Sequence, residues 1–332
     1  MFALPAADVA KMSRPAAGTT QKRLFSQRDY LAPLPIPTGE PPADVLNTIW
    51  RKNEVFLDIG SYSIGSGVMV IWPLAMMFLI MGYYSWDDDL WYIFAIGAGL
   101  IVGVPSFILI HGLFRPVPLP LRFNRQRREV CVPREDGEYW IVPWESVTAA
   151  AVQHSTVSQG GRMEMGLLFI GFDNPDPDAQ EGNQHFSLGF NCGGGTTAMA
   201  LWECMRSYME IGPQALPEAN DFDGARARLK GRNVFWGECC NYVDGIREYA
   251  VTGRMHKALW LVFALFVFGA PLAFMLQTWK LSPPPDLPYP EISEWSKPLP
   301  PEQWAKRSPE LEAAIAEREA ELAASAHAGQ AR

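Results

Sequence analysis

Cysteine and histidine are scarce in this chain, and their spacing matches no common metal or redox motif. There are five of each among 332 residues. Cys239 and Cys240 are adjacent, without the C-x-x-C spacing or the second pair that a zinc or redox site requires. All five cysteines lie between residues 131 and 240, which is typical of a reducing compartment. We therefore expect inert thiols and no disulfide framework.

Motifs of catalysis are also missing. His154, His185 and His256 stand alone, with no H-E-x-x-H pattern and no paired carboxylates, and there is no G-x-S-x-G elbow. The glycine-rich segment at 191–197 precedes a helical pattern but lacks the G-K-S/T ending of a phosphate-binding loop. The acidic run at 87–89 offers only three carboxylates, whereas calcium takes about six to eight oxygen ligands, so we expect a solvated loop there. We expect no catalytic, cofactor or metal site, and a protein that is not an enzyme.

Charge is absent from three long stretches. No charged residue lies between Asp58 and Asp87, between Asp89 and Arg115, or from Ala258 to Trp279. A helix of roughly 20 apolar residues crosses the hydrocarbon core of a bilayer, whereas apolar runs in buried helices rarely exceed about 14. The stretches therefore predict three transmembrane helices, at about 61–86, 90–114 and 258–279, of which the first two form a helical hairpin within 59–114.

Small residues recur in the second of these helices. Ala95, Gly99 and Gly103 lie four residues apart and share one helix face. This spacing favours close packing against another helix, and it leaves open which helix that is.

Basic residues near the helix ends are unevenly distributed. The loop at 87–89 has none, whereas Arg115 and a group of arginines follow the second helix, and Arg254 and Lys257 precede the third. Cytosolic loops of membrane proteins carry the excess of lysine and arginine. We expect a multi-pass protein of a bacterial inner membrane, with the N-terminus and residues 115–257 cytosolic and residues 280–332 periplasmic.

The first 55 residues show no regular apolar period. They are rich in proline, alanine and glycine, and they contain no compact apolar segment of the kind that a signal peptide has. We interpret residues 1–55 as a disordered N-terminal tail that ends in a juxtamembrane segment.

Four arginines follow the second apolar stretch within seven residues. Residues 115–257 as a whole contain 15 basic and 18 acidic residues, so a nucleic-acid-binding domain is not expected. A cluster beside a membrane marks the cytosolic side, and it can also bind anionic lipid headgroups. The candidate lipid contacts are Arg122, Arg125, Arg127 and Arg128.

Alternating apolar residues behind this cluster predict a β domain over residues 115–213. Asp136-Gly137 is a strong hairpin signal, and three further strand patterns follow between residues 147 and 191. Residues 196–211 then have an apolar stripe with a period of 3.6, with Trp202 at its centre. The pattern predicts a mainly β domain closed by one amphipathic helix, and amphipathic juxtamembrane helices over 214–257.

Residues 280–332 begin with many prolines and end in a helical pattern. The proline-rich part predicts an extended spacer, and Ser308 followed by Pro309 is a typical helix start. Trp295 and Trp304 lie in this segment, and exposed tryptophans are enriched at binding hot spots. We regard both as candidate partner contacts.

The strand run closed by a helix, with the R-F-N-R…V-P-W opening at 122–144, resembles the pleckstrin-homology-like fold. The overall plan of the chain, together with 121–145 and 196–213, resembles a family of uncharacterised bacterial multi-pass inner-membrane proteins that are often encoded near type VI secretion effectors. That resemblance implies an immunity or accessory role in toxin delivery. The expected function is thus a non-catalytic membrane interaction protein whose partner is a toxin or a secretion-system protein. The alternative is a lipid-binding scaffold at the cytosolic face.

Overall fold

The computed structural model describes residues 15–62, 64–86, 91–134, 136–158, 161–194, 196–218 and 233–330. The chain divides into two compact units. We call the first the α+β unit; it combines Met1–Ser61, Leu119–Asn220 and Asp286–Arg332. The second, the helical unit, combines Tyr62–Pro118 and Asp221–Pro285. Both units are therefore assembled from segments that are distant in the sequence.

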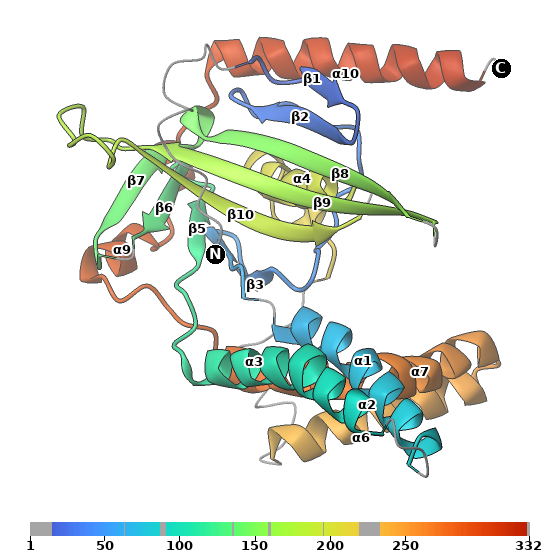
Figure 1. The fold of residues 1–332 in the computed structure, drawn as a ribbon. Helices are drawn as coiled ribbons and strands as arrows, with labels where there is room; N and C mark the ends of the chain where they lie inside the picture. The colour runs from blue at the N-terminus through green and yellow to red at the C-terminus, as the bar shows by residue number, and fades with distance from the viewer. Residues whose placement is uncertain are drawn as a thin grey trace. The chain divides into compact units, whose positions relative to one another are not determined.

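Two five-stranded antiparallel sheets form the body of the α+β unit (Figure 1). Sheet A has the strand order β1-β2-β8-β9-β10, and sheet B has the order β3-β4-β5-β6-β7. The strands of sheet A are β1 (Thr20–Arg23), β2 (Ser26–Ala32), β8 (Thr148–Ser158), β9 (Gly161–Asp173) and β10 (His185–Gly193). Those of sheet B are β3 (Ile49–Lys52), β4 (Phe56–Ile59), β5 (Leu121–Asn124), β6 (Glu129–Pro133) and β7 (Tyr139–Pro143).

Helix α4 (Thr197–Glu210) lies against β8, β9 and β10 (Figure 1). It is found where the 3.6-residue stripe places it. Trp202 is fully buried at its centre and stacks on Trp144, with the ring centroids 5.3 Å apart. The surrounding core takes side chains from both sheets and from α4. One continuous core therefore holds the two sheets together, and the unit is a mixture of α and β structure.

The N-terminal segment is not a disordered tail from residue 15 onward. Strand β2 pairs with β8, opposing Asp29 to Ala151, and β4 pairs with β5, opposing Leu57 to Phe123. Leu57 is fully buried. The expectation of disorder failed because strand pairing across more than 60 residues leaves no mark on local composition. Residues 1–14 lie outside the described part of the chain.

The C-terminal segment also belongs to the α+β unit. It contains α9 (Pro290–Trp295), a 3₁₀ turn η5 (Pro301–Gln303) and α10 (Pro309–Gln330). Ser308 caps α10, because its hydroxyl accepts a hydrogen bond from the backbone N–H of Leu311 at 3.1 Å. A bilayer cannot lie between two parts of one folded unit. This packing does not agree with the expectation that residues 115–257 and 280–332 lie on opposite sides of a membrane, and the orientation stays a prediction.

Two long apolar helical stretches define the helical unit. Helix α1 covers Ile64–Tyr84, and α2 (Trp91–Ala98), a π-helical turn η2 (Gly99–Gly103) and α3 (Val104–Phe114) follow each other without a break. The stretches Gly67–Tyr84 and Trp91–Phe114 are long and apolar enough to cross a membrane. These are the first two predicted transmembrane helices.

The third apolar stretch is not one straight helix. Helices α7 (Met255–Phe268) and α8 (Ala270–Leu281) meet at an angle of 80°. Gly269 stands between them in the left-handed conformation, at φ 61°. A Cβ there would lie 2.7 Å from the Trp72 ring, and the Trp72 indole N–H donates to the Phe266 carbonyl at 2.9 Å. The break is thus fixed by glycine and by a contact with α1.

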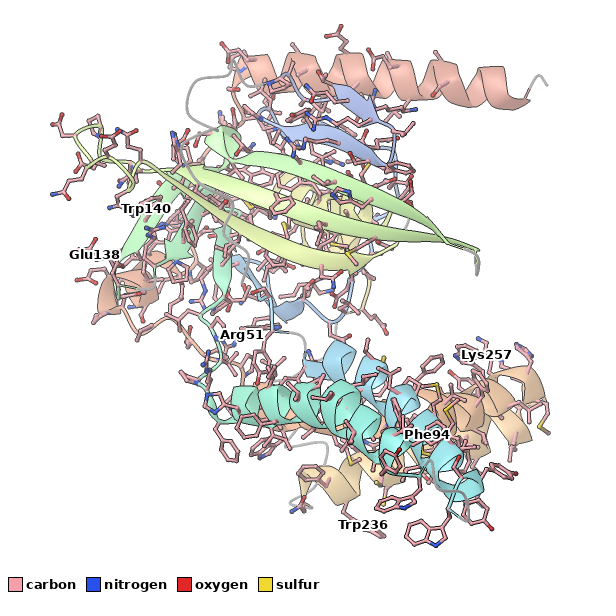
Figure 2. All side chains as sticks on the ribbon, viewed as in Figure 1. Arg51, Phe94, Glu138, Trp140, Trp236 and Lys257 are labelled. Atoms are coloured by element: carbon pink, nitrogen blue, oxygen red, sulfur yellow. The ribbon has the colours of Figure 1, made fainter. Side chains whose placement is uncertain are left out.

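Helix α6 (Val234–Val251) precedes this pair and contacts both of its members. Asp244, Arg247 and Glu248 of this helix are exposed. Trp236 is 67% exposed and is labelled in Figure 2. Helix α6 accounts for part of the predicted amphipathic segment at 214–257; residues 219–232 lie outside the described part of the chain.

The small-residue strip has no partner in the described chain. Ala95, Gly99 and Gly103 are exposed, and a Cβ at Gly99 would meet nothing within 4 Å. A neighbouring glycine, Gly97, faces Phe78 of α1 instead, where a Cβ would lie 3.1 Å from that ring. Close packing through the strip stays a prediction.

Candidate functional site

The four clustered arginines lie on β5 and on the turn to β6, and all four bond to other parts of the α+β unit. Arg122 and Arg128 are buried, whereas Arg125 and Arg127 are half-buried. Strand β5 is the central strand of sheet B, and residues 286–307 contact it and its neighbours; we call these residues the C-terminal strap. The strap brings further charged side chains to the four arginines.

Arg122 forms a buried ion pair with Asp58, which stands opposite it on β4. Its Nε and Nη2 donate to the two Asp58 oxygens at 2.6 and 2.7 Å, and Nη2 also donates to Asp286 of the strap at 2.7 Å. Arg51 adds a longer contact to Asp58 at 3.4 Å. Two carboxylates and two guanidinium groups thus balance, as buried charges require.

These neighbours shift the pKa values of the group in different directions. Burial raises the pKa of the Asp58 carboxyl, and the Arg122 guanidinium acts against that shift. Burial acts to lower the pKa of Arg122, but its hydrogen bonds to Asp58 and the negative charges of Asp58 and Asp286 outweigh burial, and the pKa rises. Asp286 is 69% exposed, and Arg122 lowers its pKa. Arg122 is therefore a fixed cation that holds the strap to the sheet.

Arg128 forms a second centre around Glu210 at the end of α4. Its Nη1 and Nη2 donate to the Glu210 carboxylate at 3.2 and 2.9 Å, and the Trp144 indole N–H donates at 2.8 Å. Arg307 of the strap bonds to the same carboxylate and to the Glu210 carbonyl. The Glu210 side chain is only 1% exposed. The centre joins the turn after β5, helix α4 and the strap.

Trp295 is the apolar anchor of the strap. It is 8% exposed and clusters with Leu287, Ile292 and Cys131. Its indole N–H donates to Glu129 at 2.7 Å, and its carbonyl accepts from Asn124 Nδ2 at 2.9 Å. This residue fills a pocket in its own chain.

Trp304 and Gln126 fasten the next part of the strap. The backbone N–H of Leu299 donates to Gln126 Oε1 at 2.6 Å, and the N–H of Ala305 donates to the Gln126 carbonyl at 2.8 Å. The Arg125 guanidinium lies over the Trp304 ring, 5.4 Å from its centroid. The proline-rich segment is therefore held against the β5–β6 turn of sheet B and is not a free spacer.

These contacts decide which of the predicted lipid and partner contacts remain candidates. Arg122 and Arg128 are buried and paired within the unit, so lipid contact is no longer expected of them. Lipid contact through Arg125 and Arg127 stays a prediction, although Arg127 Nε already donates to the Trp295 carbonyl at 3.0 Å. Trp295 is no longer a candidate partner contact because it is buried. Trp304 is half-buried, and its partner role stays a prediction.

Three acidic residues of this region were missed by sequence reasoning. Asp58, Glu210 and Asp286 provide the counter-charges for the buried arginines. A weak signal was available for Asp58, because it is the last charge before a long apolar run and follows a strand-like alternation. Nothing in the local sequence links Glu210 or Asp286 to arginines more than 80 residues away.

The contacts of this region hold three segments of the α+β unit together. Within the described ranges, no three of the His, Cys, Asp and Glu side chains lie close enough together to hold a metal ion. The charged groups of β5, the β5–β6 turn and the strap are paired with each other, which fixes the strap but leaves no free nucleophile or base among them. Comparisons with protein-family models, curated proteins and solved structures gave no match for this chain.

Proposed function

We propose that the chain is a non-catalytic membrane interaction protein that presents its α+β unit on one side of a bilayer, the cytosolic side. The observation that carries the proposal is the assembly of this unit from three segments. The helices α1 and α2–α3 separate the first segment from the second, and α6–α8 separate the second from the third. All three segments must lie on one side, so the chain between them must cross the membrane an even number of times.

The chain between the first and second segments can return to its starting side by crossing the membrane twice. Helix α1 has 21 residues and the stretch from Trp91 to Phe114 has 24. At 1.5 Å per residue, each exceeds or matches a hydrocarbon core of about 30 Å. Two antiparallel crossings return the chain to its starting side. The loop with Asp87–Asp89 then lies on the other side.

The chain between the second and third segments can return to its starting side if α7 and α8 form a re-entrant pair. Helices α7 and α8 have 14 and 12 residues, or about 21 and 18 Å, so neither crosses alone. The 80° bend at Gly269 prevents them from acting as one straight span. Helix α6 contains four charged residues and is too polar to cross. We infer that residues 255–281 enter the membrane and return to the same face.

The distribution of charge supports the cytosolic side. In this arrangement Lys52, Arg115, Lys257 and Lys280 all flank the apolar helices on one face, and the acidic loop at 87–89 lies on the other. Cytosolic flanks are enriched in lysine and arginine. The revised path places Lys280 with the other basic residues, whereas a third span would have put it opposite them.

A pleckstrin-homology-like fold is part of the proposal. The order of β4–β7 in sheet B, then β8–β10 in sheet A, then α4 supports it, with the helical hairpin inserted between β4 and β5. A type VI secretion role rests on the resemblance in overall plan and in segments 121–145 and 196–213.

A competition experiment tests the functional part of the proposal. The gene is deleted from a bacterium that encodes it, alone and together with its neighbours, and each mutant is grown against the parent strain. An immunity role predicts that both mutants are poisoned by their parent, and that the multiple mutant, if it has also lost the toxin gene, no longer poisons the single mutant. An accessory role predicts that killing of other strains is lost. Normal survival and normal killing would contradict the secretion link.

A further inference from the structure

The tip of the β1–β2 hairpin exposes two large apolar side chains. Leu24 and Phe25 form the turn, and their side chains are 87% and 58% exposed. Turns at such positions are usually made of small or polar residues. Further along the same hairpin, Leu31 and Ala32 are buried in the core. The base of the hairpin is therefore part of the core, whereas packing within the unit does not explain the apolar side chains at its tip.

Basic side chains surround this tip. Lys22, Arg23 and Arg28 are exposed, and their side chains make no ion pair or hydrogen bond with any other described residue. The sequence from Pro15 to Arg28 contains no acidic residue. The next acidic residue, Asp29, is 7% exposed and is bonded to Thr20 and Gln27. The tip is thus a local cationic patch on a chain whose net charge is −8.

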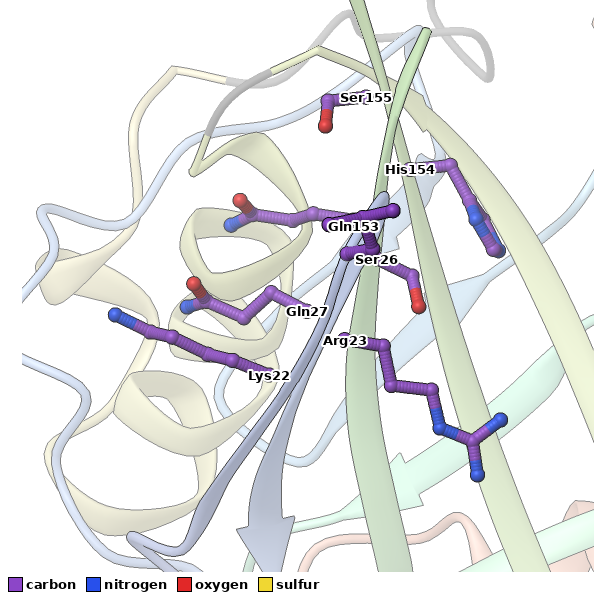
Figure 3. A pocket seen from close by; sticks show the side chains of 8 residues that line it. Lys22, Arg23, Ser26, Gln27, Gln153, His154 and Ser155 are labelled. Atoms are coloured by element: carbon purple, nitrogen blue, oxygen red, sulfur yellow. The ribbon is translucent and has the colours of Figure 1, made fainter.

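Cross-strand pairing sorts the neighbouring side chains into two rows. Arg23 pairs with Ser26, and Ser26 pairs with His154 of β8, so these three side chains share one face. Lys22, Gln27 and Gln153 form the corresponding row on the other face. Figure 3 shows the two rows pointing to opposite sides of the strands. Together they line a surface pocket of about 270 Å³.

The row of Arg23, Ser26 and His154 suits an oxyanion. Guanidinium, hydroxyl and imidazole groups can each donate a hydrogen bond to a phosphate oxygen. None of the three carries a negative charge that would repel an anion. The apolar pair lies directly beside this row, because Leu24 and Phe25 connect Arg23 to Ser26. A lipid provides both an anionic headgroup and an apolar tail at this distance.

We propose that the β1–β2 hairpin tip docks on an anionic bilayer, with Leu24 and Phe25 among the lipid chains and the basic side chains at the headgroup phosphates. The inference rests on the proposed membrane anchorage, which keeps the α+β unit near a bilayer at a high effective concentration. The proposal assigns lipid contact to Lys22, Arg23 and Arg28, whose side chains are unpaired, in place of the clustered arginines that pair within the unit. Each basic side chain near an anionic surface adds a modest attraction, so the tip needs the anchor to dock stably.

A photo-reactive residue at the tip tests the proposal in the full chain. Phe25 is replaced by benzoylphenylalanine, and the protein is reconstituted into nanodiscs of phosphatidylcholine with or without phosphatidylglycerol. After irradiation, lipid adducts are measured by mass spectrometry. We expect adducts in the anionic discs, reduced roughly tenfold or more by K22E/R23E/R28E. High salt is expected to reduce them in the unsubstituted hairpin as well.

The same probe at Ile211 is the matched control, because that side chain is apolar and 49% exposed on another part of the unit. Adducts at both positions, or adducts at position 25 that ignore charge reversal and salt, would overturn the proposal. Protein adducts at position 25 in native membranes, without lipid adducts, would show that a protein covers the tip. Failure of the chain to enter nanodiscs would instead contradict the membrane anchorage itself.

Discussion

Arg122 and Asp58 face each other on neighbouring strands and form two hydrogen bonds of 2.6 and 2.7 Å, although the whole helical hairpin α1–α3 lies between them in the sequence. The pair therefore closes sheet B around an insertion of apolar helices. Asp286 joins the same guanidinium after the second helical segment. One arginine thus links all three segments of the α+β unit.

Removing the Arg122 charge is expected to destabilise this unit strongly. Arg122→Met leaves Asp58 buried without its main partner, and breaking a buried pair in this way costs about 3–5 kcal/mol. The double variant R122M/D58L is expected to recover much of the loss, because no charge is then left unpaired. Pulse proteolysis of the full chain in increasing urea measures the free energy of unfolding of the single and the double variant. Arg28→Met, at an exposed arginine, is the control and is expected to change little.

Glu210 makes stability depend on acid pH. Burial alone would raise the pKa of Glu210, but Arg128, Trp144 and Arg307 outweigh burial and hold it below its ordinary value of 4.5. A lowered pKa in the folded state contributes stability that is present above pH 4.5 and is lost as the pH falls through the folded value. Glu210→Gln is therefore expected to be less stable than the parent at neutral pH.

The stability gap between the parent and Glu210→Gln is expected to narrow as the pH falls below 4.5. Thermal unfolding of both proteins at several pH values measures this. Glu302→Gln, at an exposed carboxylate, is the matched control and should follow the parent at each pH. A gap that stays constant down to strongly acid pH would show that the Glu210 charge does not stabilise the fold.

Trp202 is expected to be the most sensitive position of α4. It is fully buried against Trp144, and truncation of a large buried aromatic residue to alanine costs about 3–5 kcal/mol. Urea-dependent proteolysis of Trp202→Ala should show a loss of this size. Ile211→Ala, at the exposed end of the same helix, should lose far less. Similar stability of the two variants would be inconsistent with a core closed by α4.

Three of the cysteines are expected to resist alkylation in the folded protein. Burial raises the pKa of Cys131 and Cys204 to about 12 and that of Cys192 to about 11, so their reactive thiolate forms are rare at neutral pH. Mass spectrometry after iodoacetamide treatment should find label only at Cys239 and Cys240, which are half-buried. Labelling of all five is expected in denaturant. Fast native labelling of Cys131 would contradict the packing of the strap over β6.

The parts of the fold that were predicted from the sequence depend on local patterns. The hairpin at Asp136-Gly137, the stripe around Trp202 and the cap at Ser308 each need only a few neighbouring residues. The pairing of Asp29 with Ala151 depends on residues that are far apart, and proline and glycine around β2 hid its alternation.

The candidate site was mislocated for a related reason. A run of arginines after an apolar stretch fits a membrane-facing patch as well as a set of buried ion pairs, and the counter-charges decide between the two. Those counter-charges lie 64 residues away for Asp58 and 82 residues away for Glu210. The break between α7 and α8 did leave a local sign, since Gly269 with Pro271 is a typical helix end followed by a helix start.

The side of the membrane on which the C-terminus lies is the most direct test of this account. Cys239 and Cys240 are replaced by serine, single cysteines are introduced as Ser325→Cys and Asp88→Cys, and intact cells are treated with a membrane-impermeant maleimide. We predict that Cys at position 88 is labelled in intact cells, whereas Cys at position 325 is labelled only after the membrane is opened. Labelling at position 325 in intact cells, with an internal probe at Gln214→Cys protected, would contradict the single-sided α+β unit.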